Sequence, residues 1–580
     1  ISVESPEGAA AYNAKVRRFF EDGPNPAAFM RAVMYSDLGD KYQHFDQNDE
    51  ACGALVNGTP MTVARLDRYF YATDPLTGGQ PGLRKTAGMA LARGVGYMGY
   101  SGHGSPGMMG NVIDKEFVDS YSYNTAPFGM FATCETYAFD RGGFSICNYL
   151  LGKENGGVIC LLAAGRSVIL NYNRRLGTEI ASCYAALKPG DTYGDLLRRA
   201  RNSILTENTT ISLCRNTMCY NFGGDPALPV AVPEFGIVLD DADDKVFTPL
   251  KAKALSGYIS DGNGDVAEDF DGTVELAVHR NAVTRVNLTD TETLKTAADD
   301  SDILCSATAK VTGGRFSVTL TAPLSSDGDA PNRISMAAVD AAGRCAAGAD
   351  MSYSVASEAA SGDDVDLTAP EMLNMYIDSE EFRSGDIVGS NYVFHAVVDP
   401  SPSGLRISSG LERSVKLTLD RSMSVPAAAA YARVGADGLV YFDIPFPEAT
   451  VGKHTIFLEV ANNVGVTASA NVDFIVGGQQ LSAVLSHDKD GTAVARDFIE
   501  FSLDGADSTH GRLLVVDRAG HTVLSVPACS FPYRWNLTAA DGARVSDGAY
   551  RAWVVLGDGA VAGSTEAIHF TVLRPLEGNK

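Results

Sequence analysis

The sequence lacks three features that would each point to a well-known class of protein. None of its ten cysteines belongs to a CxxC pair, so a structural zinc site is not expected. It has no run of eighteen apolar residues, and the nearest stretch, residues 157–170, is interrupted by Arg166, so no membrane-spanning helix is predicted. Its 47 lysines and arginines are outnumbered by 71 aspartates and glutamates. The net charge of −24 argues against a nucleic-acid partner or an anionic membrane surface, because either would repel the chain.

The start of the chain also lacks a signal peptide. The segment Ile1-Ser-Val-Glu-Ser-Pro has neither the basic start nor the apolar core that such a peptide needs. We therefore expect a mature or processed chain, or a fragment of a longer one. The cysteines do not assign a compartment, but Cys305 and Cys345 could form a disulfide if they lie on adjacent strands.

The chain has 580 residues, which are too many for a single hydrophobic core. Its sequence pattern changes near residue 237 and so divides it into two regions. Before this point, helical and strand patterns alternate. Ser5-Pro6-Glu7 is typical of a helix start. Helices are predicted at 5–20, 83–93, 176–187 and 193–205, and strands at 30–36, 95–101, 128–133 and 157–164. Near-continuous apolar strands between helices indicate a largely parallel sheet that is covered on both faces.

After Pro233, short alternating runs bounded by Gly, Asp, Asn and Pro replace this pattern. Such runs recur at residues 272–278, 315–320, 414–419, 454–460, 497–503, 512–516 and 549–555. Short strands with this turn punctuation are typical of β-sandwich domains. We predict an α/β domain over 1–237 and three sandwiches over 238–361, 362–478 and 479–580.

Two of the predicted strands end in residue types that suit nucleophilic catalysis. The strand at 95–101 leads into Gly102-His103-Gly104, and the strand at 128–133 leads into Cys134. A cysteine nucleophile needs a base, and histidine, with an ordinary pKa of about 6.5, suits that task near neutral pH. Neighbouring parallel strands would bring the two groups together at their carboxyl ends. The alternatives are a loop histidine and a buried, inert cysteine.

Two observations bear on His103 and its neighbourhood. His44 and His103 are the only histidines in the α/β region, so few other bases are available there. Asp37 and Asp40 follow the strand at 30–36, and either could orient the imidazole, although both could also be solvated loop acids. The nearby acids Asp46, Asp49 and Glu50 could line a specificity pocket.

A second candidate site lies at Asp261-Gly-Asn-Gly-Asp265, which is partly similar to a calcium-binding loop. The twelfth position from Asp261 is Gly272, where such a loop needs an acid. Ordinary turn chemistry in a hairpin explains the same residues, and we favour that interpretation.

Four segments of the α/β region, in the same order, resemble conserved blocks of the gingipain-type cysteine peptidases, family C25 of the clan that includes caspases and legumains. They are Tyr97-Met-Gly-Tyr-Ser-Gly-His103-Gly104, Phe131-Ala-Thr-Cys134, Gly156-Gly-Val-Ile-Cys-Leu-Leu-Ala-Ala-Gly-Arg166 and Asn221-Phe-Gly-Gly-Asp225-Pro226-Ala227-Leu228. The β tail resembles the modules of one branch of this family, the sortase-like surface enzymes of type IX secretion. The end of the chain, including Val515-Val-Asp-Arg-Ala-Gly520 and Tyr533-Arg-Trp535, resembles the terminal Ig-like signal domain of secreted cargo.

The resemblance implies a fold and a set of catalytic residues. The fold would be a caspase-like α/β domain followed by Ig-like sandwiches, with residues 1–237 forming the C-terminal portion of the peptidase domain. Cys134 would be the nucleophile and His103 the general base. The backbone N–H groups of Gly104 and Cys134 would form the oxyanion hole. Asp37 or Asp40 would be the orienting acid, no cofactor is expected, and a bound metal is left open.

The resemblance also implies a function at the cell surface of a Gram-negative bacterium, on the outer face of the outer membrane. Such enzymes remove the C-terminal signal domain of cargo, and water or an amine of an anionic lipopolysaccharide would resolve the acyl-enzyme. The expected partners are cargo proteins, outer-membrane components of the secretion system and an N-terminal fragment of the same protein. That fragment would supply the first strand of the catalytic sheet, which in this family precedes the equivalent of Ile1.

Two other functions remain open from the sequence. The first is a secreted gingipain-like endopeptidase, which a broad cleavage profile on a peptide library would favour. The second is a non-catalytic surface scaffold of the secretion machinery, in which the peptidase fold is vestigial. Retention of both His103 and Cys134 weighs against the scaffold.

Overall fold

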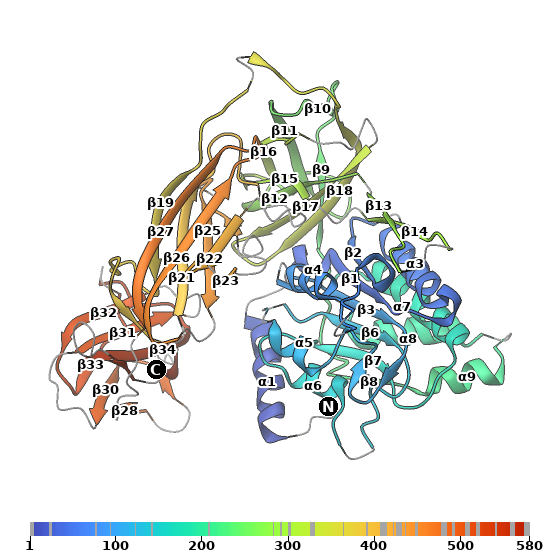
Figure 1. The fold of residues 1–580 in the computed structure, drawn as a ribbon, viewed down its shortest axis with the longest axis horizontal. Coiled ribbons are helices and arrows are strands. Elements are labelled where there is room, and N and C mark those ends of the chain that lie inside the picture. Colours follow the sequence, from blue (N-terminus) through green and yellow to red (C-terminus); the bar gives the residue numbers. More distant parts are fainter. Residues whose placement is uncertain are drawn as a thin grey trace.

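The computed structural model of the chain consists of a mixed α/β part and a long tail built of strands (Figure 1). It describes residues 5–573 except 22–25, 58, 76–77, 93, 122, 124, 141–142, 207–208, 282, 290–292, 300–302, 325–330, 363–364, 390–391, 407–414, 422, 425–431, 436, 447–449, 477–483, 490–492, 505–510, 518–521, 540–541, 557–562 and 566. Within these residues, no helix is both long enough and apolar enough to cross a bilayer.

The α/β part is built on one six-stranded sheet in the order β2-β1-β3-β6-β7-β8. Its strands are β1 (Arg31–Ser36), β2 (Thr62–Asp67), β3 (Tyr97–Ser101), β6 (Phe128–Ala132), β7 (Cys160–Ala164) and β8 (Tyr220–Gly223). The first five in sheet order are parallel, and β8 runs antiparallel to β7. Every residue of β3, β6 and β7 is buried, which explains why these strands have continuous apolar sequences.

Helices cover both faces of this sheet. One face packs against α3, α7 and α8, and the other packs against α1, α4, α5 and α6. The helices are α1 (Pro6–Glu21), α2 (Pro26–Phe29), α3 (Gln43–Val56), α4 (Pro81–Ala92), α5 (Lys115–Ser120), α6 (Ile146–Gly152), α7 (Leu170–Ala185), α8 (Tyr193–Ile204) and α9 (Ile211–Met218). The predicted helices are confirmed as α1, α4, α7 and α8, with α7 beginning six residues before its predicted start. The short elements η1 (Asp40–Tyr42), η2 (Arg68–Phe70), β4 (Gly104–Ser105) and β5 (Met108–Met109) lie in loops.

The tail has three separate hydrophobic cores, which define the first, second and third β parts. The first β part contains β9 (Phe235–Leu239), β10 (Val246–Phe247), β11 (Ala252–Ser260), β12 (Gly272–His279), β13 (Val283–Val286), β14 (Thr296–Asp299), β15 (Ile303–Val311), β16 (Arg315–Thr321), β17 (Pro331–Asp340) and β18 (Cys345–Val355). Eight of these strands form one continuous sheet, and β13 and β14 pair separately as a hairpin.

The second and third β parts are each built from two sheets. The second contains β19 (Glu371–Ile377), β20 (Ile387–Val388), β21 (Tyr392–Asp399), β22 (Val415–Leu419), β23 (Met423–Ser424), β24 (Ala432–Val434), β25 (Val440–Phe446), β26 (Gly452–Ala461) and β27 (Thr467–Val476). The third contains β28 (Val484–His487), β29 (Val494–Ala495), β30 (Ile499–Asp504), β31 (Gly511–Asp517), β32 (Thr522–Cys529), β33 (Tyr533–Trp535), β34 (Gly548–Leu556), β35 (Gly563–Ser564) and β36 (Ile568–Val572).

The change from α/β to β structure lies before Phe235, slightly ahead of the predicted boundary at 237. The reason is that β9 pairs with β11 and β18 and so belongs to the first β part. The predicted breaks near 362–364 and 477–480 fall on residues 363–364 and 477–483, which lie outside the described residues.

Two other sequence expectations are decided by the strand order. A disulfide between Cys305 and Cys345 is wrong, because their strands, β15 and β18, are not adjacent but are separated by β12 and β17. The Asp261 loop is a turn, as favoured, in which Oδ1 of Asp261 accepts the backbone N–H groups of Asn263 and Asp265. It does not close a hairpin, because β11 pairs with β9 and β16 whereas β12 pairs with β15 and β17.

Asp378 is a buried carboxylate where the second β part meets the third, and it leads to a prediction about pH. Its side chain accepts the N–H of Val393 at 2.8 Å, and its carbonyl accepts the hydroxyl of Thr522 at 3.1 Å. Burial raises the pKa of Asp378 to about 6, against an ordinary value of 3.8. The folded chain therefore binds more protons than the unfolded chain between these values, so stability falls as the pH rises from about 4 to about 6.

We expect Asp378→Asn to remove this part of the pH dependence. The amide oxygen can still accept the Val393 N–H, and at pH 7 the free energy of unfolding should rise by up to about 3 kcal/mol. Hydrogen exchange of β19 and β21 at pH 4.5 and pH 7 measures the effect. The exposed Glu371→Gln variant is the control. Equal pH dependence in the wild-type and Asp378→Asn chains would contradict the prediction.

Candidate active site

The carboxyl edge of the parallel sheet brings His103 and Cys134 to equivalent positions. β3 and β6 are neighbours, and their last residues, Ser101 and Ala132, pair with each other. His103 and Cys134 each follow their strand by two residues. The strand ends therefore deliver both side chains to one edge of the sheet, the arrangement on which the sequence interpretation depends.

The backbone at Gly104 lies directly against the segment that carries Cys134. A Cβ atom at Gly104 would lie 2.3 Å from Oγ1 of Thr133 and 3.0 Å from the carbonyl oxygen of Cys134. Only glycine permits this approach, since any side chain would push the two loops apart. The contact holds the backbone of residue 104 beside the thiol-bearing turn, where the oxyanion hole was predicted.

The Cys134 thiol lies near the amino-terminal end of α7. Its Sγ atom accepts the backbone N–H of Val168 at 3.3 Å, and Val168 comes two residues before the helix begins. A helix amino terminus and an amide donor both stabilise a thiolate. The next residue, Glu135, has a φ of +56°, so the chain turns sharply after Cys134 in a conformation that non-glycine residues rarely adopt.

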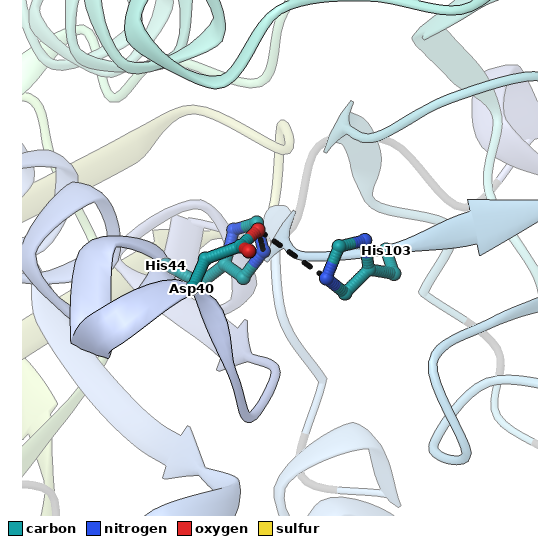
Figure 2. Close-up of side chains that lie close together, drawn as sticks. All are labelled: Asp40, His44 and His103. Carbon is teal, nitrogen blue, oxygen red and sulfur yellow. Dashed lines mark ion pairs between the residues drawn. The ribbon is translucent and has the colours of Figure 1, made fainter.

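The His103 imidazole is about two-thirds exposed and faces Asp40 (Figure 2). Its Nε2 lies 3.3 Å from Oδ2 of Asp40, so Nδ1 is the ring nitrogen left to serve a thiol. No hydrogen bond joins His103 and Cys134 within the described part of the chain, where the hydrogen bonds of Sγ are with the backbone of Val168. Catalytic hydrogen bonds are often long in free enzymes and shorten when substrate binds.

The two candidate acids have different positions relative to His103. Asp37 is buried, and its carboxylate accepts from Arg68 at 2.7 Å and from the backbone N–H of His103 at 3.4 Å. The hydroxyl of Tyr100 lies between two acceptors, the His103 carbonyl at 2.7 Å and Oδ2 of Asp37 at 3.3 Å, and donates its single proton to one of them. Asp37 thus holds the backbone of His103, whereas Asp40 contacts the ring.

Asp40 is presented by a turn of unusual backbone conformation. Gly39 has a φ of +93°, and the next three residues, Asp40, Lys41 and Tyr42, all have φ values between 46° and 68°. Non-glycine residues in this region cost roughly 1–2 kcal/mol each, so the surrounding structure must hold the turn. Tyr69 contributes by accepting the Gly39 N–H at 2.8 Å and by packing its ring on that of Tyr42.

The β13–β14 hairpin of the first β part also holds this turn. Asn287 donates to the hydroxyl of Tyr42 at 3.3 Å, and the N–H of Leu288 donates to the carbonyl of Tyr69 at 2.7 Å. Lys295 forms an ion pair with Asp46 at 2.7 Å and places its ammonium over the ring of Tyr42. Asp46, suggested from the sequence as a pocket acid, is therefore paired across the interface between the two parts.

This interface predicts a positioning role for Lys295. We expect Lys295→Ala to weaken the support of the Asp40 turn by about 1 kcal/mol and to lower kcat/KM roughly three- to tenfold with little change in KM. Hydrolysis of a peptide substrate by the Lys295→Ala chain measures the effect. The matched control is Lys453→Ala, an exposed lysine of β26 in the second β part. Equal activities of the two variants would contradict the role.

The comparisons with known proteins concern the α/β part above all. The model of peptidase family C25 matches residues 1–231, so this region is similar to that family. The matched region includes Cys134, His103, Gly104 and both candidate acids. A comparison with curated proteins found no match.

Solved structures with similarity to the chain include two from Porphyromonas gingivalis. Dimeric latent PorU is 21% identical with a TM-score of 0.29, and the match covers 73% of this chain and 42% of that one. The complex of the RgpB pro- and mature domains is 13% identical with a TM-score of 0.31, covering 59% and 73%. The fibronectin(III)-like modules of Clostridium thermocellum CbhA are 12% identical with a TM-score of 0.15, covering 36% and 98%. The chain thus spans less than half the length of the PorU structure.

Sequence reasoning missed three parts of the site. It did not assign roles to the Val168 amide, to the β13–β14 hairpin or to His44, which packs its ring against that of His103 at 4.9 Å. Only His44 had a usable signal, because it follows Asp40 by four residues, a spacing at which two side chains can meet on one face of a helical turn. The other two depend on contacts between distant segments.

Proposed function

We propose that this chain carries the catalytic residues of a cell-surface cysteine peptidase that removes C-terminal signal domains from type IX cargo. The observation that carries the proposal is the placement of Cys134 and His103 after paired residues of adjacent parallel strands. The thiol faces an amide at the start of α7, and the imidazole faces Asp40. The similarity of residues 1–231 to family C25 supports the same chemistry.

In the first step, His103 accepts the thiol proton and Sγ of Cys134 attacks the carbonyl carbon of the scissile bond. The backbone N–H groups of Gly104 and Cys134 would donate to the oxyanion that develops. As the C–N bond breaks, the imidazolium returns its proton to the leaving amine, which is the amino terminus of the released signal domain. The cargo remains attached to Cys134 through a thioester.

The second step decides whether the enzyme is a hydrolase or a transpeptidase. His103 would remove a proton from water or from an amine, and the resulting nucleophile would displace the thiolate from the acyl carbon. Attack by water yields a free cargo carboxylate. Attack by an amine of an anionic lipopolysaccharide would yield an amide that anchors the cargo on the outer face of the outer membrane.

The β parts and the partners complete the proposal. The three β parts would act as Ig-like modules that hold the peptidase among the outer-membrane components of the secretion system. An N-terminal fragment of the same protein would accompany the chain. The net charge of −24 favours solubility but would repel an anionic lipid, so contacts with outer-membrane proteins, and not charge, would hold the chain at the surface.

A cellular experiment tests the proposal. A strain that carries Cys134→Ala should accumulate cargo with its C-terminal signal domain still attached, and mass spectrometry of surface cargo reads this out directly. Normal trimming of cargo in that strain would overturn the proposed function. With the purified protein, broad cleavage of a peptide library would instead favour a gingipain-like endopeptidase, whereas cleavage confined to signal-domain junctions supports the proposal.

Asp40 supplies a further prediction about the same reaction. We expect Asp40→Asn to lower kcat about 10- to 100-fold, because the ring loses the carboxylate that orients it. The loss should appear in kcat and not in KM, because the carboxylate contacts the ring and not the substrate. Asp49→Asn is the control, since Asp49 pairs with Arg65. Equal kcat values for Asp40→Asn and Asp49→Asn would contradict the role.

A further inference from the structure

Three side chains at the edge of the candidate active site bring nitrogen and oxygen atoms together in the manner of metal ligands. Asp40, His44 and His103 each offer one ligand atom, and these atoms all lie within 4.8 Å of one another (Figure 2). Oδ2 of Asp40 is 3.0 Å from Nε2 of His44 and 3.3 Å from Nε2 of His103. In a tetrahedral zinc site with bonds of 2.0–2.1 Å, neighbouring ligand atoms are about 3.3 Å apart. The two distances from Asp40 are already close to that spacing.

His44 provides an independent indication of a ligand. Its side chain is 4% exposed, and neither ring nitrogen has a hydrogen-bond partner among the described residues. Nε2 lies 3.0 Å from Oδ2 of Asp40, a contact that is an ion pair when the imidazole is protonated. A buried polar group left in this state costs roughly 1–3 kcal/mol, which a bond to a metal ion would offset.

We propose that Asp40, His44 and His103 bind one divalent transition-metal ion, with Zn²⁺ the best match. Two imidazoles and one carboxylate suit zinc, whereas calcium and magnesium prefer all-oxygen sites. The fourth position of the tetrahedron is left to water, because two of the three side chains, those of Asp40 and His103, are substantially exposed. Because none of its ligands is a cysteine, this site is of a different kind from the CxxC structural zinc sites that the sequence argues against.

The metal would act as a reversible inhibitor, a consequence that rests on the proposed function. His103 cannot bind Zn²⁺ through Nε2 and retain Asp40 as its orienting acid, because the same carboxylate oxygen would bind the ion. The positive charge of the ion would also oppose protonation of the imidazole, and acceptance of the thiol proton is the step that creates the nucleophile. Zinc release would restore the His103–Asp40 pair.

Metal binding is tested first, with no activity measurement. The full chain with Cys134→Ala is titrated with Zn²⁺ by calorimetry, and Co²⁺ is added separately as a spectroscopic probe. We expect one tight site and a tetrahedral Co²⁺ spectrum that lacks thiolate-to-metal charge transfer. Adding His44→Gln or Asp40→Asn should each weaken Zn²⁺ binding about 100-fold, whereas the exposed His569→Gln should leave it unchanged.

Thermal unfolding in the absence of metal shows that each variant is folded. Two results would overturn the site: Zn²⁺ affinity unchanged in both His44→Gln and Asp40→Asn, or a Co²⁺ spectrum dominated by thiolate. The use of two substitutions keeps the proposal testable if one of them fails to fold.

Inhibition is tested second, on the chain with its native Cys134. We expect Zn²⁺ to suppress cleavage reversibly and a chelator to restore it. His44→Gln should need at least tenfold more Zn²⁺ than the wild-type chain for half inhibition of its own metal-free activity, since one of three ligands is lost. Equal zinc sensitivity of the wild-type and His44→Gln chains would overturn the inhibitory role. Absence of all peptidase activity would count against the proposed function, and the calorimetry would still decide the metal site.

Discussion

Replacing Cys134 with alanine is expected to abolish peptide cleavage, with a loss in kcat of at least about 10⁴-fold. Without the thiolate no acyl-enzyme forms, and only the oxyanion hole and substrate binding remain to accelerate attack by water. Steady-state cleavage of a peptide that spans a signal-domain junction measures the loss. The fold should be unaffected, because the Cys134 thiol is partly exposed and its hydrogen bonds in the described structure are with the Val168 backbone.

Cys183 offers a matched comparison within the same α/β part. Both thiols are partly exposed, but burial and the neighbouring Glu179 raise the pKa of Cys183 to about 11. An electrophilic peptide probe should therefore label Cys134 at least tenfold faster than Cys183 at pH 7, since only the thiolate reacts. Cys183→Ala should keep full activity. Equal labelling of the two thiols would favour the non-catalytic scaffold.

The second large effect is expected from Asp37→Ala, and it is an effect on stability. Asp37 and Arg68 form an ion pair at 2.7 Å in which both side chains are more than 90% buried. Removing the carboxylate leaves the buried guanidinium of Arg68 without its counter-ion, and its remaining side-chain acceptor is Oε1 of Gln80. Such an unpaired buried charge lowers the free energy of unfolding by about 3–5 kcal/mol. The His103 backbone N–H loses the same acceptor, whereas the Tyr100 hydroxyl keeps the His103 carbonyl at 2.7 Å.

The measurement must report the α/β part specifically. Both tryptophans of the chain, Trp535 and Trp553, lie in the third β part, so their fluorescence does not report the region around Asp37. Hydrogen exchange of the backbone amides of β1 and β3, followed under increasing denaturant, reports the stability of this region. Glu50→Ala is the matched control, because it breaks the exposed Glu50–Arg174 pair and should cost at most about 1 kcal/mol. A cost for Asp37→Ala no larger than for Glu50→Ala would contradict the prediction.

The parts of the fold that could be predicted are those whose local pattern agrees with their final environment. β3, β6 and β7 are buried on both faces, so their apolar runs identify them without knowledge of their neighbours. β2 escaped prediction because Arg65 and Asp67 interrupt its apolar residues. Both are buried in the folded chain, where they form an ion pair at 3.0 Å that satisfies them, and no local rule anticipates such a partner.

The candidate site divides in the same way. The positions of His103 and Cys134 follow from where two strands end, and these strand ends can be predicted from the local residue types. The distinction between Asp37 and Asp40 does not follow from their spacing. It depends on the left-handed turn at residues 39–42, which carries Asp40 toward the imidazole and leaves Asp37 facing Arg68.

By itself the sequence determined the parallel sheet, the change to β structure and the placement of a thiol and an imidazole at the ends of two strands. Each of these depends on periodicity and on residue types that are close together in the chain. Tertiary structure alone decided which acid faces His103, that His44 completes a three-ligand cluster, and that Lys295 supports the turn from about 250 residues away. These contacts depend on a packing geometry that no local pattern encodes, because the segments meet only when the first β part docks on the α/β part.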